Sequence, residues 1–145
     1  MAERAKSEEE LRRLSMEMRY LEQTAEALQQ RISMVNAAIT DIGYANMTLD
    51  GIEKEKENAE LFVPIGGSSY VKVKLADSNK IIIGLGSGVS IEKTLLDAKT
   101  TLKERLDELE KTMNSAQQQF SQVAERINSG RSRLENLLGA REGKP

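Results

Sequence analysis

The chain has 145 residues and a formal net charge of -2, it contains no Cys, His or Trp, and aromatic residues make up only 3% of it. The near balance of charge argues against a nucleic-acid-binding protein, which normally carries a basic excess. Without His or Cys, the chain lacks the usual catalytic base and the thiol nucleophile, so we expect no enzyme, no cofactor and no metal site.

Charged residues make up 30% of the chain, and Ala, Leu, Glu, Lys and Gln are abundant, which is typical of long helices and coiled coils. The N-terminal residues are charged and lack the apolar segment of a secretory signal, and no apolar run is long enough to span a membrane. We therefore expect one domain in a soluble, cytoplasmic protein. The absence of Cys agrees with this expectation, because the cytosol is reducing and does not favour disulfides.

The first element predicted is a long helix over residues 8–57. Ser7 and Glu10 have the S-x-x-E spacing of a capping box, which predicts that the helix starts here. Apolar residues then recur three and four positions apart without a break, which predicts a left-handed coiled coil with a partner helix. The positions of this first seam are Leu11, Leu14, Met18, Leu21, Ala25, Leu28, Ile32, Val35, Ile39 and Ile42.

The period then changes, and we predict short β-strands over residues 60–90. Residues 70–75 alternate between polar and apolar, and residues 80–85 form a second apolar run after a turn at 77–79. So small a sheet cannot bury its apolar face alone, so it must pack on the helices or on sheets of other chains. The predicted core and assembly residues are Phe62, Val63, Ile65, Tyr70, Val71, Val73, Leu75, Ile81, Ile83, Leu85 and Val89.

A second long helix is predicted over residues 91–138, with Ser90 as its N-cap. Its seam contains one extra residue between Leu102 and Leu106, a stutter that relaxes the supercoil locally. Because the two helices have similar lengths and flank the strands, we expect an antiparallel coiled coil within one chain; two parallel dimeric coils are the alternative. The second seam comprises Ile91, Leu95, Ala98, Leu102, Leu106, Leu109, Met113, Ala116, Phe120, Val123 and Ile127, and continues through Gly130 to Leu134, Leu137 and Leu138.

The segment Gly84–Val89 lies between a predicted strand and a predicted helix, as a dinucleotide-binding loop does. The third glycine of that motif would fall at Val89, and no second strand follows to complete the β-α-β unit. We therefore assign these glycines to turns and expect no nucleotide site.

Two segments, 58–67 (NAELFVPIGG) and 80–94 (KIIIGLGSGVSIEKT), resemble the entry to and the exit from the β-region of prefoldin subunits. The order helix, β-region, helix over nearly the whole chain is similar to the same family, and four strands resemble its alpha class, of the archaeal type. This resemblance implies a mainly α fold: a long antiparallel two-helix coiled coil with a central block of two β-hairpins that join an oligomeric β-barrel.

The resemblance also implies partners and an activity. These are a hetero-hexamer of two alpha-class and four beta-class subunits, unfolded client proteins held at the coiled-coil tips, and ATP-independent delivery to a group II chaperonin. A structural tether or spacer with a β oligomerisation base is the alternative, and for each tip residue the alternative role is to close the coil. The candidate client-binding residues are Leu11, Leu14, Met16, Met18, Ile127, Leu134, Leu137 and Leu138.

Overall fold

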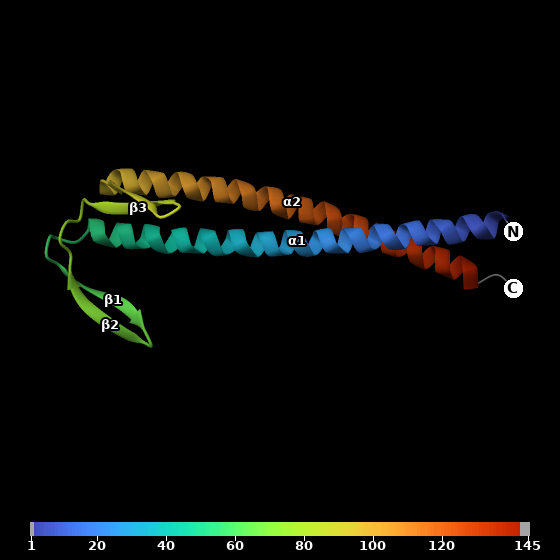
Figure 1. Ribbon diagram of the computed structural model, residues 1–145, viewed down its shortest axis with the longest axis horizontal. Coiled ribbons are helices and arrows are strands. Elements are labelled where there is room, and N and C mark those ends of the chain that lie inside the picture. Colours follow the sequence, from blue (N-terminus) through green and yellow to red (C-terminus); the bar gives the residue numbers. More distant parts are fainter. Residues whose placement is uncertain (1, 143–145) are drawn as a thin grey trace. The chain divides into compact units, whose positions relative to one another are not determined.

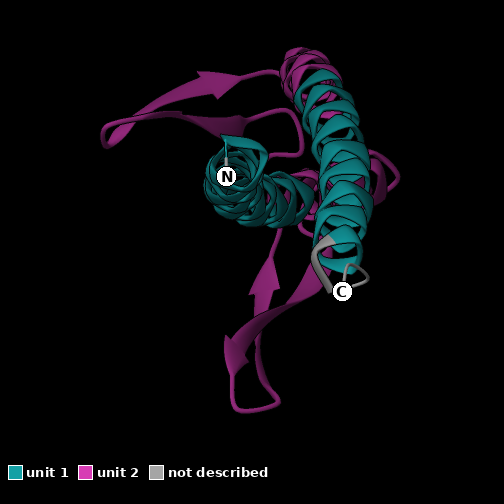
Figure 2. Ribbon diagram, turned by 90° about the vertical axis from the view of Figure 1, so that its right-hand side faces the viewer, with its two compact units in different colours: residues 1–37, 111–145 teal, residues 38–110 magenta. Residues whose placement is uncertain are grey.

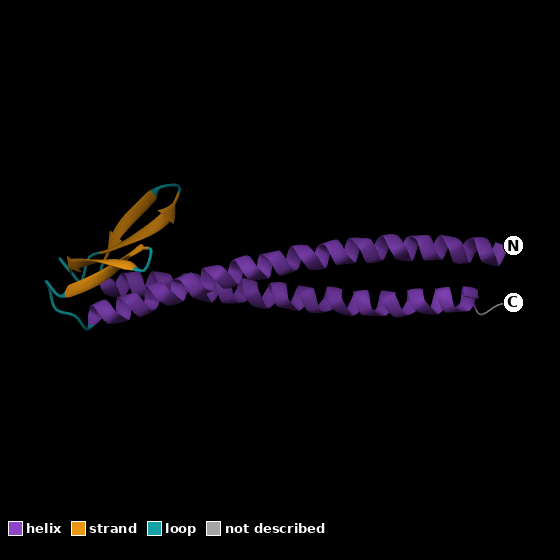
Figure 3. Cartoon of the chain, turned by 90° about the horizontal axis from the view of Figure 1, so that it is seen from below, coloured by secondary structure: helices purple, strands orange, loops and turns teal. Residues whose placement is uncertain are grey.

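The computed structural model describes residues 2–142, which form two long helices and two β-hairpins (Figure 1). Helix α1 spans Ala2–Glu53 and helix α2 spans Leu95–Glu142. Between them lie β1 (Glu60–Gly66), β2 (Ser69–Lys74), β3 (Ile81–Gly86) and β4 (Val89–Lys93). Strand β1 pairs with β2 and β3 with β4, both antiparallel, so the predicted fold class of two helices flanking two hairpins is confirmed (Figure 3).

The chain divides into two compact units (Figure 2). The first contains the described parts of residues 1–37 and 111–145, which are helical throughout, and the second is residues 38–110, which hold the hairpins and the adjoining helix ends. In the first unit Glu10 contacts Arg133 and Met18 contacts Gly130. The numbering therefore runs in opposite directions along the paired segments, so the helices are antiparallel within one chain and the alternative of two parallel coils is wrong.

Both predicted seams form the contact surface of the helices. All ten positions of the first seam are half-buried or buried, with Met18 and Leu21 only 7% and 6% exposed. In the second seam, every position from Leu95 to Ile127 is half-buried or buried as well. Two seam residues are exposed: Ile91, because it lies in β4 and not in the helix, and Leu138, near the end of α2.

The predicted ends of the first helix are wrong. Helix α1 starts at Ala2, because the preceding residues Ala2–Lys6 are all good helix formers, so Ser7 lies inside the helix and is not its cap. At the other end the helix stops at Glu53 instead of residue 57. Two tight turns end the helix there: the amide of Lys54 donates to the carbonyl of Gly51, and the amide of Glu55 donates to that of Ile52.

The second helix also has different ends from those predicted. Ser90 belongs to β4, and Thr94 is the N-cap, because its hydroxyl accepts a hydrogen bond from the amide of Asp97 at 3.2 Å. The β-region accordingly extends to Lys93 instead of ending at residue 90. At the far end the helix continues through Gly139 to Glu142, since one glycine costs only about 1 kcal/mol relative to Ala and does not by itself end a helix.

A small buried cluster joins hairpin β3–β4 to the two helices in the second unit. Its members are Leu49, Ile83, Ala98 and Leu102, with Ile42, Ala45, Ile81 and Leu95 packed against them. Polar contacts support the same junction: Arg105 donates to the carbonyl of Gly84 at 2.7 Å, and Lys93 donates to the hydroxyl of Thr101 at 2.7 Å. Hairpin β3–β4 is therefore docked on its own helices through one face.

Both hairpins have the same type of turn. Each has a two-residue loop in which both residues have positive φ, Gly67–Ser68 in the first and Ser87–Gly88 in the second, as tight hairpin turns require. An irregularity in the strand register precedes each loop, between Pro64 and Gly66 and between Gly84 and Gly86. The glycine-rich segment 84–89 is thus a hairpin turn, as the sequence predicted.

Candidate functional site

The predicted tip residues lie in the first unit, where the first turns of α1 meet the last turns of α2. Most of them are at least partly covered, because they lie in the seam: Leu11, Leu14, Ile127, Leu134 and Leu137 are half-buried and Met18 is buried. Only two are exposed, Met16 at 67% and Leu138 at 41%. The structure therefore brings the candidates together at one end of the helix pair, with the seam closed.

Gly130 has a packing role that sequence reasoning missed. A Cβ atom added at this position would overlap the Sδ atom of Met18, so the missing side chain makes room for Met18 in the seam. From the sequence, Gly130 was expected only to weaken the helix locally and so to favour opening of the seam. The signal was available, because an antiparallel pairing of the two seams places the long side chain of Met18 opposite Gly130, which has no side chain to occupy the same space.

The same end of the helix pair carries an ion pair and two hollows. Arg133 pairs with Glu10 across the two helices. One hollow, of about 450 Å³, is lined by Leu14, Glu10, Arg133 and neighbouring charged residues of α1. A second, of about 620 Å³, is lined by Leu14, Gly130, Arg133 and polar residues of both helices. The seam is therefore less completely filled around Leu14 than at Leu21, which is 6% exposed.

The predicted assembly residues divide into a covered set and an exposed set. Ile83 is buried and Ile81 packs against the buried cluster, so these two belong to the core of the subunit. Val73 and Leu75 are half-buried. The remaining seven are exposed: Phe62, Val63, Ile65, Tyr70, Val71, Leu85 and Val89.

Hairpin β1–β2 differs from hairpin β3–β4 because it carries exposed apolar side chains on both of its faces. Cross-strand partners share a face, so Val63 and Val71 lie on one side, while Phe62, Pro64 and Tyr70 lie on the other. Val63 and Val71 are 42% and 44% exposed, and Phe62 and Tyr70 are 69% and 63% exposed. Within the described residues, no member of β1 or β2 belongs to the buried cluster. This hairpin thus presents an apolar surface that its own helices leave open.

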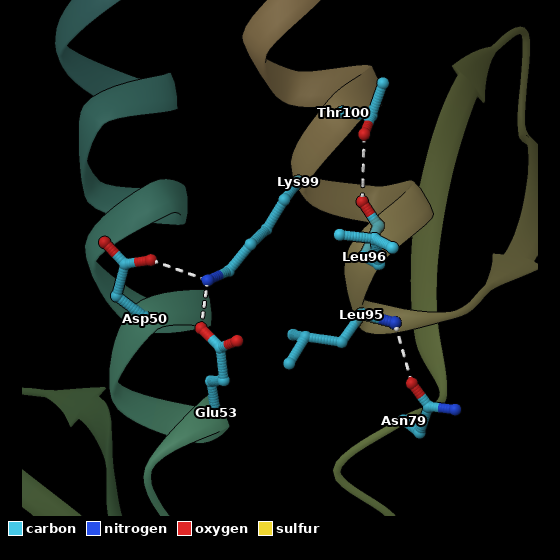
Figure 4. Close-up of polar contacts among 7 residues, drawn as sticks. All are labelled: Asp50, Glu53, Asn79, Leu95, Leu96, Lys99 and Thr100. Atoms are coloured by element: carbon cyan, nitrogen blue, oxygen red, sulfur yellow. Dashed lines mark hydrogen bonds and ion pairs between the residues drawn. The ribbon is translucent and has the colours of Figure 1, made fainter.

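The second unit also contains a charged junction between the end of α1 and the start of α2 (Figure 4). Lys99 forms ion pairs with Asp50, at 2.9 Å, and with Glu53, and these contacts raise the pKa of Lys99, the hydrogen bond to Glu53 contributing most. Both acids lie near the C-terminus of α1, where the helix dipole disfavours negative charge, so Lys99 offsets an unfavourable arrangement. On the other side, Asn79 accepts a hydrogen bond from the amide of Leu95 at 3.1 Å and helps to cap α2.

Sequence reasoning missed several exposed apolar side chains outside the seams. They are Tyr20, Met34, Tyr44, Met47, Ile82 and Leu96, all between 65% and 74% exposed. For the residues in the helices the signal was available, because Met, Tyr and Leu occur there at positions outside the two seams; Ile82 lies in β3.

The residues that the structure describes contain neither a metal-binding group of acidic side chains nor a membrane-spanning helix. No group of three or more Asp and Glu side chains in residues 2–142 is arranged to hold a metal ion. In the same part of the chain, neither helix has a segment that is long and apolar enough to cross a membrane.

Comparison with protein families matches residues 21–139 to the model described as "Prefoldin subunit". Among similar proteins, the prefoldin alpha subunit of Methanococcoides burtonii is 32% identical and aligns over 93% of this chain and 95% of its own length. The alpha subunit of Pyrococcus horikoshii is 31% identical over 85% of this chain and 84% of its own. That of Methanosarcina barkeri is 36% identical over 74% and 76%.

Solved structures show the same fold. A filamentous prefoldin from Methanocaldococcus jannaschii superimposes with a TM-score of 0.66 at 20% identity, covering 77% of this chain and 93% of the other. The prefoldin beta subunit from Thermococcus strain KS-1 gives a TM-score of 0.59 at 16% identity, covering 88% and 90%. The match over residues 21–139 and the three archaeal alpha subunits named above confirm the resemblance seen in the sequence: the chain belongs to the prefoldin family of chaperone subunits.

Proposed function

We propose that this chain is the alpha-class subunit of a cytoplasmic, ATP-independent holdase. Two copies would assemble with four beta-class subunits through the β-hairpins, which would join in a β-barrel. The tips of the coiled coils would hold unfolded proteins and deliver them to a group II chaperonin. Membership of the prefoldin family supports the chaperone class, and the finer statements depend on the following features of this chain.

The observation that carries the proposal is the open apolar surface of hairpin β1–β2. Phe62 and Tyr70 are more than half exposed on one face, and Val63 and Val71 are more than two-fifths exposed on the other. Exposed apolar strands with free edges invite pairing with other chains unless they are covered. Assembly with the hairpins of other subunits would cover both faces and would use the free strand edges at the same time.

Assembly would also explain how weak tips hold a client. A single tip offers only a few apolar side chains, among them the exposed Met16 and Leu138, and flexible Met and Leu residues adapt to varied partners. Several tips on one oligomer would engage one unfolded chain at high effective concentration, and each contact would remain reversible. Such a holdase can release its client without ATP.

The tether is the second candidate, and one observation favours it: the seam is closed at the tip, where Leu134 and Leu137 are half-buried. A spacer would need the seam residues only to hold its two helices together. A holdase would need them to contact clients.

An aggregation assay separates the two candidates. The chain would be assembled with a beta-class subunit and mixed with a denatured protein during dilution, and light scattering would be followed. We expect the complex to suppress aggregation and the triple variant Leu134→Ser, Leu137→Ser, Leu138→Ser to lose most of this effect. The matched control is Gln117→Ser, Gln118→Ser, Gln119→Ser, three exposed positions of the same helix, which should behave as the wild type. Circular dichroism would verify that both variants stay helical. A wild-type complex that fails to suppress aggregation would leave the tether as the better account.

A further inference from the structure

The closed tip poses a problem for client binding that the structure itself can answer. Leu11, Leu14, Leu134 and Leu137 are half-buried against the opposite helix, so a client can reach them fully only when the two helix ends separate. Two features of this chain determine where and how readily such a separation would start. One is the contact of Met18 with Gly130, and the other is the ion pair of Glu10 with Arg133.

The Met18–Gly130 contact marks the last well-filled layer of the seam. Met18 is 7% exposed, and Leu21, one layer further from the helix ends, is 6% exposed. Toward the helix ends, Leu14 and Leu11 are only half-buried. The first hollow lies beside Leu14, and the second runs from Gln122 past Gly130 to Arg133. Gly130 also weakens α2 locally, because glycine has more backbone freedom than any other residue. Among the described glycines, Gly130 is the one at which an added Cβ would meet another residue within 4 Å. The packing of Met18 therefore depends on a residue without a side chain at this position.

The Glu10–Arg133 pair lies on the other side of Leu14 from this layer. Arg133 lines both hollows, and Glu10 lines the first, so the pair closes over the loosely packed Leu14. The side chains of Arg133 and Glu10 are 65% and 41% exposed, so water screens their attraction. A pair of this kind shifts an opening equilibrium by a modest factor, about twofold to fivefold, and does not lock it.

We propose that these features form a gate at the tip. The helix ends beyond the Met18–Gly130 layer separate as one unit, and the Glu10–Arg133 ion pair sets the fraction of time for which they are apart. The flexible side chain of Met18 can adjust on Gly130 as the ends beyond it separate, whereas the seam from Leu21 onward stays closed. This inference rests on the proposed function, because it regulates access to the proposed client-binding residues.

The gate can be tested with spin labels, because the chain has no native Cys in its 145 residues. Labels at Ser15→Cys and Ser132→Cys, both exposed, report the separation of the tip. Labels at Gln29→Cys and Ser121→Cys, also exposed and in the same unit, report the seam beyond the gate. Distance distributions would be measured by pulsed electron spin resonance on the complex with a beta-class subunit.

Four variants test the gate. Arg133→Gln should raise the population of the long tip distance about twofold to fivefold, and the exchanged pair Glu10→Arg with Arg133→Glu should return it to the wild-type value. Gly130→Ala should displace Met18 and widen the tip, and adding Met18→Ala should restore the short distance by providing room for the new methyl group. The Gln29–Ser121 distance should stay the same throughout. The gate is overturned if Arg133→Gln and Gly130→Ala leave the tip distance unchanged, or if both label pairs widen equally.

Aggregation assays on the same complexes keep this proposal separate from the proposed function. If the wild-type complex captures clients and Arg133→Gln captures more at limiting chaperone, by about the twofold to fivefold factor of tip opening, both proposals hold. If Arg133→Gln opens the tip without changing capture, the gate has no role in client binding while the holdase function stands. If the wild type captures nothing, the holdase function fails whatever the distances show, and the gate as a regulator of capture fails with it.

Discussion

Ala98 shows how a single small residue permits three elements to meet. It is fully buried, at 0% exposure, in the cluster with Leu49 of α1, Ile83 of β3 and Leu102 of its own helix. The short side chain lets α1 and hairpin β3–β4 approach the same turn of α2, and a longer one would push at least one of them away.

Replacing Ala98 by Leu should therefore destabilise the chain. Overfilled cores force off-rotamer side chains and backbone shifts, and we expect a loss of about 1–3 kcal/mol in the free energy of unfolding. Urea unfolding followed by circular dichroism would measure it. Ala27→Leu, at an exposed position of α1, is the matched control and should change the free energy by less than about 0.5 kcal/mol. Equal effects of the two substitutions would show that Ala98 is not confined.

Lys99 gives a prediction for pH. Its pKa is raised in the folded chain by Glu53 and Asp50, so the stability it contributes is complete below its ordinary pKa of 10.5 and is lost as the pH rises through the raised value. We expect Lys99→Met to be less stable than the wild type at about pH 8, and the difference to shrink by about pH 11. Urea unfolding of both proteins over this range tests it. A difference that is constant or grows with pH would contradict the role of the ion pairs.

At the scale of elements, the stutter in α2 has a structural purpose. The extra residue between Leu102 and Leu106 places both Arg105 and Leu106 at half-buried positions. Leu106 continues the seam, while Arg105 reaches the carbonyl of Gly84 in β3. The interruption of the heptad thus lets the same stretch of α2 pack against α1 through Leu106 and bind hairpin β3–β4 through Arg105.

The β3–β4 turn provides an element-scale prediction with a control in the same strand. Gly86 has φ of +96°, a conformation that side chains with a Cβ rarely adopt, whereas Gly84 is not in this region and has open space around it. Gly86→Val should therefore destabilise the chain by about 1–3 kcal/mol, and Gly84→Val should be close to neutral, since β-branched residues suit strands. Thermal unfolding would compare them. If Gly84→Val were the more harmful variant, the assigned turn geometry would be wrong.

Periodicity predicted those elements whose structure depends on spacing alone. The two seams and the stutter could be derived from residue intervals, the hairpin turns from their glycines, and the antiparallel pair from the similar lengths of the two helices. The start of α2 was harder to derive, because Ser90 and Thr94 are both N-cap residue types and the choice between them depends on tertiary contacts. Asn79, far from Thr94 in the sequence, helps to cap α2, and nothing near Ser90 reveals that β4 continues to Lys93. Similarly, alternation in a strand identifies two faces without showing which one is covered, so Ile83 and Phe62 looked equivalent.

At the scale of the whole molecule, the proposed function depends on assembly. Under this proposal, a chain with exposed apolar residues on both faces of hairpin β1–β2 is incomplete until it assembles, and a single tip with few exposed apolar residues would bind a client only weakly. Each would be completed by the other: hairpins would join several chains, and several chains would bring their tips to one client. Capture should therefore fail when assembly fails, even if every tip is intact.

The most direct test is to compare client capture by assembled and unassembled chains of equal tip composition. Phe62→Ser with Tyr70→Ser alters one exposed face of hairpin β1–β2 and leaves the first unit, with its tip residues, unchanged. Sedimentation with a beta-class subunit would establish that this variant stays unassembled, and circular dichroism that it remains helical. Light scattering of a denatured client should then show suppression by the wild-type complex and little or none by the variant at the same chain concentration. Equal suppression by both would contradict the claim that assembly through the hairpin makes the tips effective.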